Sequence, residues 1–175
     1  LPYLIGEEIN NHPRQEPGRH AIYLSDLQEE NELDKWKCLK DIVEQKVKPE
    51  RLRLGSNPNN IPLKRKWWAY QAHRPELYQR ISQKKRALCI SRVGQAMAFA
   101  FCPTDYIFSE AVVVFDIDCY GYFGALQSRV HDYWARSFSS SLKDDLRYTA
   151  SDCYETFAFP ESLVGSSSLI QRNAD

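Results

Sequence analysis

The sequence predicts a mixed α+β fold: a single irregular domain with a central mixed or antiparallel sheet and flanking helices. Apolar runs typical of strands, at 87–93, 96–101 and 111–117, are interspersed with helical periodicity, as at 30–47. The two patterns do not alternate regularly, as they would in a parallel βαβ protein. A length of 175 residues with 43% hydrophobic residues is enough for one domain with its own core.

In the first half of the chain, short strands come before helices. Strands are expected at 2–5 and 20–24, separated by turn residues. An amphipathic helix is expected over 30–47, because apolar residues recur there every three or four positions. The polar segment 54–62 contains prolines and predicts a non-helical loop. Pro75 begins a short helix.

In the second half, the strands at 87–93 and 96–101 are expected to form a hairpin with its turn at Gly94-Gln95. The continuous apolar run at 111–117 is typical of a strand buried on both faces. The strongest helical stripe runs from 123 to 138 and predicts one long helix.

The C-terminal part ends in an aromatic motif over 147–160, in which Tyr154, Phe157 and Phe159 indicate a half-buried strand. The polar residues that follow look like a frayed end. We therefore expect a domain over 1–160 and a flexible end over 161–175.

The formal net charge is zero, but the charges are unevenly distributed. Residues 48–92 hold twelve Lys and Arg against two Glu, a formal charge of +10, so the remainder carries −10. A local excess of this size attracts polyanions even when the total cancels. Aromatic residues such as Trp67 and Trp68 interleave with the basic ones. Two interpretations stay open: a nucleic-acid contact, or a solvated basic face with aromatic side chains turned inward.

The five cysteines are widely spaced, without a Cys-x-x-Cys pair. This pattern indicates inert thiols in a reducing compartment rather than disulfides or a zinc site. No apolar run approaches the ~20 residues of a membrane span, and the first residues lack the features of a signal peptide. We expect a cytoplasmic protein with no membrane partner.

No arrangement of residues predicts a catalytic site. Asp41, Glu44 and Lys46 have the composition of a metal-dependent nuclease site, but all three lie on one expected helix, whereas such a site needs its first acid on a separate strand. His131 and Asp132 are adjacent on a helix, where neighbours do not face each other. No glycine-rich phosphate loop occurs. Binding is therefore favoured over catalysis, and no catalytic residue or metal ligand is assigned.

Seven short stretches, distributed over roughly residues 1–160, point to a known family when taken together. They are Pro-Tyr-Leu-Ile-Gly-Glu-Glu-Ile-Asn (2–10), Val-Lys-Pro-Glu-Arg (47–51), Lys-Trp-Trp with Arg-Pro-Glu-Leu-Tyr (66–68 and 74–78), Ser-Arg-Val (91–93), Phe-Ala-Phe-Cys-Pro-Thr (99–104), Leu-Gln-Ser-Arg-Val-His-Asp-Tyr-Trp-Ala (126–135) and Leu-Arg-Tyr-Thr-Ala-Ser-Asp-Cys-Tyr-Glu-Thr-Phe-Ala-Phe-Pro (146–160). In this order they resemble the target-recognition domain of single-chain type IIG, MmeI-like restriction–modification enzymes.

The resemblance implies that the chain is the DNA-reading part of a polypeptide that also holds an endonuclease and an adenine methyltransferase. The partners would be double-stranded DNA and that methyltransferase domain. S-adenosylmethionine and a divalent metal ion are expected for the full-length enzyme and neither for this part. The methyltransferase of this family carries the motif Asn-Pro-Pro-Tyr. The comparable stretch here, Asn57-Pro58-Asn59-Asn60, lacks the aromatic residue and is not that motif. Neither methylation nor cleavage is expected of this chain alone.

The candidate base contacts are Ser91, Arg92 and Gln95, on the expected hairpin beside the basic run. Direct readout in the major groove needs paired donors or acceptors, such as Arg for guanine and Gln for adenine. Arg92 has a structural alternative, in which it holds a carboxylate or the turn.

The candidate phosphate contacts would set affinity and register rather than sequence. They are Lys64, Arg65, Lys66, Arg74, Ser128 and Arg129. Ser128 and Arg129, together with Gln127, interrupt an apolar helix face and have a second interpretation as a contact with the methyltransferase.

The remaining motif residues are assigned to structure. One of the two adjacent tryptophans is expected to face the core, and the others expected to pack or to form scaffold are Leu126, Val130, His131, Trp134, Arg147 and Tyr148. Two rival functions stay open. One is a protein-interaction domain that docks a partner without direct DNA readout, and the weaker one is a nuclease centred on Asp41–Lys46.

Overall fold

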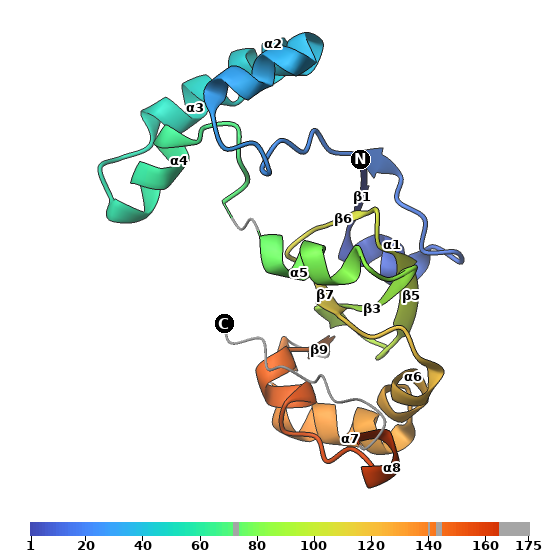
Figure 1. The fold of residues 1–175 in the computed structure, drawn as a ribbon. Coiled ribbons are helices and arrows are strands. Elements are labelled where there is room, and N and C mark those ends of the chain that lie inside the picture. Colours follow the sequence, from blue (N-terminus) through green and yellow to red (C-terminus); the bar gives the residue numbers. More distant parts are fainter. Residues whose placement is uncertain (72–73, 140, 143–144, 165–175) are drawn as a thin grey trace. The chain divides into compact units, whose positions relative to one another are not determined.

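The computed structural model describes residues 1–71, 74–139, 141–142 and 145–164 (Figure 1). The chain divides into two compact units. The helical unit comprises Leu1 with Ala21–Gln79, and the sheet unit comprises Pro2–His20 with the chain from Arg80 onward. Helices and short strands together confirm the α+β class. Among the described residues, no helix has the length and apolar character needed to cross a membrane.

The domain expected over 1–160 is thus built of two parts. Of the end expected to be flexible, 161–175, the structure describes only the short helix α8 (Glu161–Val164), and the rest lies outside the described residues.

In the helical unit, α3 packs against both α2 and α4 (Figure 1). The elements are the 3-10 helix η1 (Glu30–Trp36), α2 (Lys37–Lys46), α3 (Lys48–Arg53), the 3-10 turn η2 (Pro58–Asn60), α4 (Ile61–Arg65) and α5 (Pro75–Ile81), which continues into the sheet unit. Pro75 begins its helix as predicted.

The core of this unit holds both adjacent tryptophans, whereas only one was expected to face inward. Trp67 and Trp68 are 2% and 6% exposed, and their rings meet edge to face at 5.6 Å. Leu24, Leu33 and Val43 complete the buried cluster. Neither indole is therefore available to stack on a base in this structure.

The helix expected over 30–47 is interrupted. The Glu32 carboxylate accepts hydrogen bonds from the backbone N–H groups of Gln28 (2.7 Å) and Glu29 (3.0 Å), which would otherwise lack partners at a helix start. Trp36 has a non-helical backbone, with φ −126° and ψ 52°, so η1 ends there and α2 follows at Lys37. Periodicity alone does not reveal this break, because Leu33 and Val43 still face one core.

The prediction that 54–62 is non-helical is wrong for its second half. Pro58 lies in the first turn of η2 and Pro62 in the first turn of α4. A proline is tolerated there because the first backbone N–H groups of a helix have no intrahelical partner. The Asn57 side chain also accepts a hydrogen bond from the Asn59 N–H at 3.0 Å, which caps η2.

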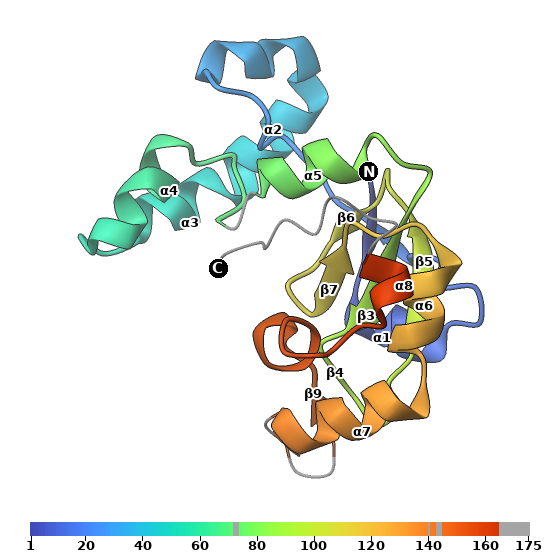
Figure 2. The ribbon, with the colours of Figure 1, turned by 60° about the horizontal axis from the view of Figure 1, so that its bottom comes forward.

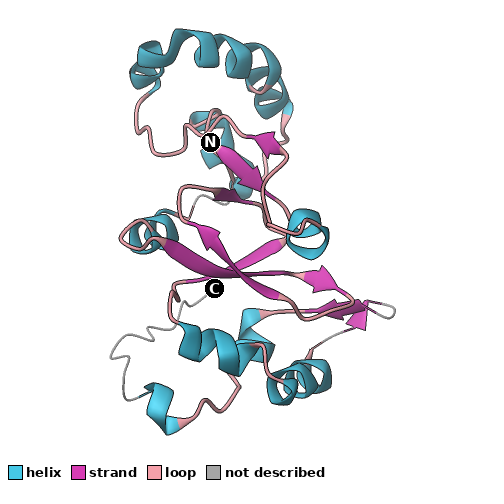
Figure 3. Cartoon of the chain, turned by 90° about the vertical axis from the view of Figure 1, so that its right-hand side faces the viewer, coloured by secondary structure: helices cyan, strands magenta, loops and turns pink. Residues whose placement is uncertain are grey.

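The sheet unit contains every strand of the described chain (magenta in Figure 3). Its elements are β1 (Pro2–Leu4), α1 (Gly6–Asn11), β2 (Arg19–His20), β3 (Arg86–Ser91), β4 (Val93–Gly94), β5 (Phe99–Pro103), β6 (Ile107–Phe108), β7 (Val112–Phe115), α6 (Tyr120–Leu126), α7 (Arg129–Phe138), β8 (Ser141–Leu142), β9 (Asp145–Arg147) and the π-helical turn η3 (Ala150–Tyr154). The strand expected at 20–24 is limited to β2, and beyond it Ala21 still bonds to the chain start, through two hydrogen bonds with the Leu1 backbone (2.8 and 2.9 Å).

The strands form three small sheets, with the orders β5–β3–β7, β4–β9–β8 and β2–β1–β6. The first two are antiparallel, and β1 pairs with β6 in parallel. In β3 every residue after Arg86 is buried. The run at 111–117 was expected to hold that place, but β7 lies at an edge and its two middle residues, Val113 and Val114, are only half-buried.

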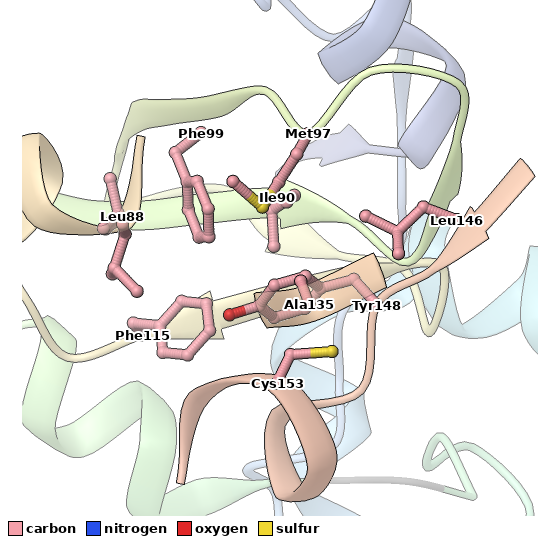
Figure 4. Close-up of a cluster of buried hydrophobic side chains, with 10 residues drawn as sticks. Leu88, Ile90, Met97, Phe99, Phe115, Ala135, Leu146, Tyr148 and Cys153 are labelled. Atoms are coloured by element: carbon pink, nitrogen blue, oxygen red, sulfur yellow. The ribbon is translucent and has the colours of Figure 1, made fainter. Parts of the chain in front are cut away.

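The main core lies between the β5–β3–β7 sheet and the C-terminal elements. Figure 4 shows side chains from this sheet pointing toward Tyr148 and Cys153. The Tyr148 ring meets Phe99 edge to face at 5.6 Å and Phe115 at 6.3 Å. Residues far apart in sequence thus close one core, which fixes β9 and α7 against the sheet.

The single helix expected from 123 to 138 is two helices. The Ser128 hydroxyl accepts a hydrogen bond from the His131 N–H (3.2 Å) and donates one to the Ala125 carbonyl (2.7 Å), so it caps α7 and closes α6. Leu126 and His131 are buried as predicted. Val130 was expected to pack, but it is 70% exposed, because α7 turns its His131–Ala135 face to the core instead.

The half-buried strand expected around Tyr154, Phe157 and Phe159 is also absent from the structure. Tyr154 ends the π-helical turn η3, and the chain then turns. The Phe159 ring packs on Tyr154 at 5.3 Å and on Phe157 at 5.1 Å. Aromatic residues at this spacing gain their burial by packing on one another, so alternation along a strand is not needed.

The buried His131 gives the fold a specific pH dependence. Its ring is fully buried and lies 3.0 Å from the Tyr148 hydroxyl through Nε2. Burial lowers the pKa of His131 to about 4, against a weaker opposing effect of Asp132. In the unfolded chain His131 has its ordinary pKa near 6.5. Between pH 6.5 and 4 it therefore binds a proton in the unfolded state and stays neutral in the folded state.

We predict that stability falls as pH drops from 6.5 toward 4, with this residue contributing up to about 3 kcal/mol. Urea unfolding of the wild type and of His131→Gln, at several pH values between 7 and 4.5, measures that contribution. The wild type should lose more stability than the variant over this range, and His20→Gln, at an exposed position, should behave as wild type. Parallel pH curves for wild type and His131→Gln would contradict the prediction.

Candidate nucleic-acid interface

The segment that joins β3 to β5 is not a tight hairpin. The two strands pair with Ile90 opposite Phe99, so residues 91–98 connect them. Within this connection Val93 and Gly94 form β4, whose partners are Arg147 and Leu146 of β9. The predicted turn at Gly94-Gln95 is therefore wrong. The predicted antiparallel return strand is confirmed as β5, but it begins at Phe99 and not at Ala96. The backbone that would have formed the hairpin pairs with a strand some fifty positions later.

The start of the 92–98 loop is held by hydrogen bonds to its backbone. The Arg92 N–H donates to the Ala111 carbonyl (2.7 Å), and the Arg92 carbonyl accepts from the Tyr148 N–H (2.8 Å). The Val93 carbonyl accepts from the Ser91 hydroxyl (2.8 Å) and from Asn10 Nδ2 (3.0 Å). Strand, helix and C-terminal core thus all fix the position of Arg92.

The end of the loop is held from α7 and from the link that precedes it. Arg136 Nη2 donates to the Gln95 carbonyl (2.9 Å), while Arg136 Nε donates to Asp132 (2.9 Å). The Gln127 side chain donates to the Met97 carbonyl (2.8 Å) and accepts from the Phe99 N–H (2.8 Å). Figure 2 shows α7 and the β4–β9 pair at the same end of the sheet.

Three side chains at this braced loop have no hydrogen-bond or ion-pair partner within the described part of the chain. Gln95 is exposed, Arg92 is half-buried with an Nε that lacks a partner, and Arg147 is exposed directly opposite Val93. Gln95 and Arg92 were predicted as base contacts, whereas Arg147 was assigned to scaffold. Its proximity follows from the β4–β9 pairing, for which the sequence gives no local signal.

Ser91, the third predicted base contact, is 6% exposed. Its hydroxyl is bound to the Val93 carbonyl, and α1 lies so close that a Cβ on Gly6 would come within 2.6 Å of the same oxygen. A base contact from Ser91 would require this hydrogen bond to break and α1 to move. In the structure Ser91 instead fixes the backbone at the start of the loop through its hydrogen bond to the Val93 carbonyl.

The predicted phosphate contacts of the helical unit lie at or next to helix ends. Lys64 (half-buried) and Arg65 (exposed) are in the last turn of α4, and Arg74 is exposed just before α5. None of these three has an ion-pair partner among the described residues. Lys66 Nζ donates to Gln28 Oε1 at 2.6 Å. Cations in the last turn of a helix also complement its dipole, which is the structural alternative for Lys64 and Arg65.

Other cations of the basic run are bound by partners inside their own unit. In the helical unit, Lys48 pairs with Glu44 (2.7 Å) and Glu30 (3.1 Å) and lies 4.6 Å from the centre of the Trp67 ring. Arg51 donates to the Ala69 carbonyl (3.3 Å). The formal excess of +10 therefore overstates the charge that a polyanion would meet.

The same holds in the sheet unit. The Arg86 guanidinium lies between the Phe101 ring (4.0 Å) and the Tyr120 ring (4.3 Å) and donates to the Asp118 carbonyl (2.8 Å). Lys84 pairs with Asp116 at 2.8 Å. Both cations join the start of β3 to the segment after β7, which is a structural role.

The two candidate phosphate contacts at the start of α7, Ser128 and Arg129, differ in role. Ser128 uses its hydroxyl as donor and acceptor in the cap of α7. Arg129 is exposed and has no partner within the described residues. Gln127, which accompanied them in the sequence pattern, braces the 92–98 loop. Ser128 could have been recognised as a cap, since Ser is a preferred N-cap residue.

The nuclease alternative finds no supporting geometry. Glu44 is bound by Lys48 at 2.7 Å and shares α2 with Asp41 and Lys46. Across the described ranges, no group of three His, Cys, Asp or Glu residues has a geometry that would hold a metal ion.

The sheet unit thus holds a braced loop whose Arg and Gln side chains are open, an arrangement suited to recognition of another molecule. The family model described as "MmeI, target recognition domain" matches residues 4–161. The chain belongs to this family of target recognition domains from restriction–modification enzymes, and the resemblance predicted from the seven motifs is confirmed.

The fold agrees with a solved relative. The structure of the type IIL restriction–modification enzyme MmeI in complex with DNA has a TM-score of 0.68 to this chain, covers 89% of it and is 21% identical in sequence. In addition, "DNA methyltransferase A" of Bacillus subtilis (strain 168) is 41% identical over 58 residues, 33% of this chain. The matches cover 19% of the MmeI chain and 6% of the methyltransferase.

Proposed function

We propose that this chain recognises a short sequence in double-stranded DNA through side chains of the 92–98 loop and its neighbour β9. The observation that carries the proposal is the contrast within the loop: its backbone is hydrogen-bonded to α1, α7 and β9, while Arg92, Gln95 and Arg147 lack partners in the described chain. A site that holds its backbone rigid and leaves paired donors and acceptors open suits readout of base edges.

In this proposal Arg92 and Arg147 bind guanine, through O6 and N7, and Gln95 binds adenine, through N6 and N7. Ser91 shapes the loop unless it rearranges on binding. Membership of the target recognition family supports this assignment, as does the fold shared with an enzyme that was solved in complex with DNA.

Phosphate contacts come from cations without internal partners. Lys64, Arg65 and Arg74 serve this role in the helical unit, with Lys66 if it releases Gln28, and Arg129 serves it in the sheet unit. Ser128 reaches a phosphate only if it gives up its capping bond. These contacts set affinity and register, and the loop sets sequence.

The chain acts, in this proposal, as a non-catalytic module that positions an adenine methyltransferase and an endonuclease of the same polypeptide. S-adenosylmethionine and a divalent metal ion belong to those domains. The support is that the chain matches only 19% of the length of the MmeI chain. Because the proposed substrate is cellular DNA, we infer that the enzyme acts in the cytoplasm.

Salt dependence of duplex binding tests the phosphate assignment. Lys64→Gln should weaken binding to all sequences alike and reduce the slope of log K against log salt by about 0.9, the value for one phosphate contact. Arg65→Gln should have a similar effect. Lys46→Gln, in the last turn of α2 and outside the predicted contacts, is the matched control and should leave the slope unchanged.

An unchanged slope in both Lys64→Gln and Arg65→Gln would remove these residues from the interface. If wild-type binding did not depend on salt at all, the rival protein-interaction function would be favoured. The observation that supports this rival is that Val130 and Tyr133, which lie one turn apart on α7, are 70% and 79% exposed.

A further inference from the structure

The outer edge of β5 is capped by a side chain. Among the described strands β5 pairs with β3 alone, so in this part of the chain its other edge has no neighbouring strand. At the start of that edge the Met97 carbonyl and the Phe99 N–H both bond to the side-chain amide of Gln127, each at 2.8 Å. The amide thereby supplies the one donor and one acceptor that another strand would offer.

Gln127 is mounted on rigid structure. It stands between α6 and α7, next to the fully buried Leu126 and the capping residue Ser128. His131, one turn into α7, is buried against the main core. The amide therefore fixes the loop relative to α6 and α7 at Met97, which is two residues after Gln95.

We propose that Gln127 is a positioning residue for sequence discrimination: it fixes the end of the 92–98 loop so that the Gln95 side chain meets its base in one geometry. The inference rests on the proposed function of the loop. Both polar atoms of the Gln127 amide are already used, so its effect is exerted through the backbone and not through contact with DNA.

The expected consequence is loss of selectivity with the fold retained. Met97 is 6% exposed, and its side chain anchors the loop in the core even without the amide. Specific contacts need groups held within about 0.5 Å, so a loosened backbone degrades base readout before it affects phosphate contacts.

The test compares Gln127→Met, of similar size but without the amide, with the wild type and with the control Gln45→Met, which replaces an exposed amide on α2. Residue-level hydrogen exchange measures protection of the Phe99 amide. Competition between a preferred duplex and single-base variants of it measures discrimination, and binding to unrelated duplex measures non-specific affinity.

Gln127→Met should expose the Phe99 amide to exchange and lower discrimination at the base read by Gln95 by about tenfold, part of the roughly 5- to 150-fold that one bidentate contact supplies. Non-specific affinity and its salt slope should stay close to wild type, and the melting temperature should fall by only a few degrees, because two hydrogen bonds are lost while the core is kept. Gln45→Met should change none of these quantities.

Unaltered discrimination in a variant whose Phe99 amide has lost protection would overturn the inference and leave the proposed function intact. An equal loss of affinity for all sequences would also overturn it, by indicating a direct backbone contact or misfolding. If the wild type itself preferred no duplex, the proposed function would fail, and the exchange data would still report whether Gln127 braces the loop.

Discussion

Replacing Gln95 with alanine is expected to relax discrimination at one base position of the recognised site by about 5- to 150-fold, because a good bidentate contact supplies about 1–3 kcal/mol. The side chain is exposed and makes no bond within the described residues, so its removal should leave stability unchanged. The Gln95 carbonyl, which Arg136 holds, is kept in the variant. The effect should therefore be confined to readout.

Competition binding against a panel of single-base variants measures this change. Arg147→Ala should relax a second, different position, since Arg147 lies on β9, opposite Val93 of the loop. The matched control is Gln83→Ala, an exposed glutamine of the same unit outside the loop, which should alter no position. A Gln95→Ala profile that superimposes on the wild type would show that the loop does not read bases through this residue.

Replacing Leu88 with alanine is expected to lower the free energy of unfolding by about 2–5 kcal/mol, the range for deletion of a fully buried leucine side chain. Leu88 is 0% exposed in the central strand β3, and its cross-strand neighbours are Phe101 and Phe115. Both neighbours come from the sheet, which limits how far the cavity can collapse.

Urea unfolding measures this loss. Val130→Ala removes methyl groups at a position that is 70% exposed, and it should cost no more than about 0.5 kcal/mol. If the two variants were equally stable, the assignment of β3 as the centre of the core would be wrong. The same experiment also tests the exposure of Val130: a larger loss of stability would show that this side chain packs, as the sequence predicted.

Features set by near neighbours in the chain could be predicted from the sequence. Pro75 begins its helix as expected, β1 lies within its expected range, and the run at 87–93 overlaps the central strand β3 over 87–91. The family could be recognised too, because seven stretches in order constrain the whole fold. The helix break at Ser128 was missed although Ser is a preferred N-cap, because the apolar stripe continues across it.

Features set by distant pairing could not be predicted. Gly94-Gln95 has the composition of a turn, but β4 pairs with β9, so this backbone takes part in a sheet. The same pairing brings Arg147 to the loop. The charge excess over 48–92 was counted correctly, yet which cations stay open depends on partners such as Glu44 for Lys48 and Asp116 for Lys84.

The most direct test of the central claim is selection of duplexes from a random-sequence pool by the wild-type chain, followed by sequencing of the bound fraction. DNA recognition through the 92–98 loop predicts enrichment of one short sequence, which changes at a single position when Gln95→Ala is used for the selection. A bound fraction with no enriched sequence, or the same enriched sequence at the same strength for both proteins, would contradict it.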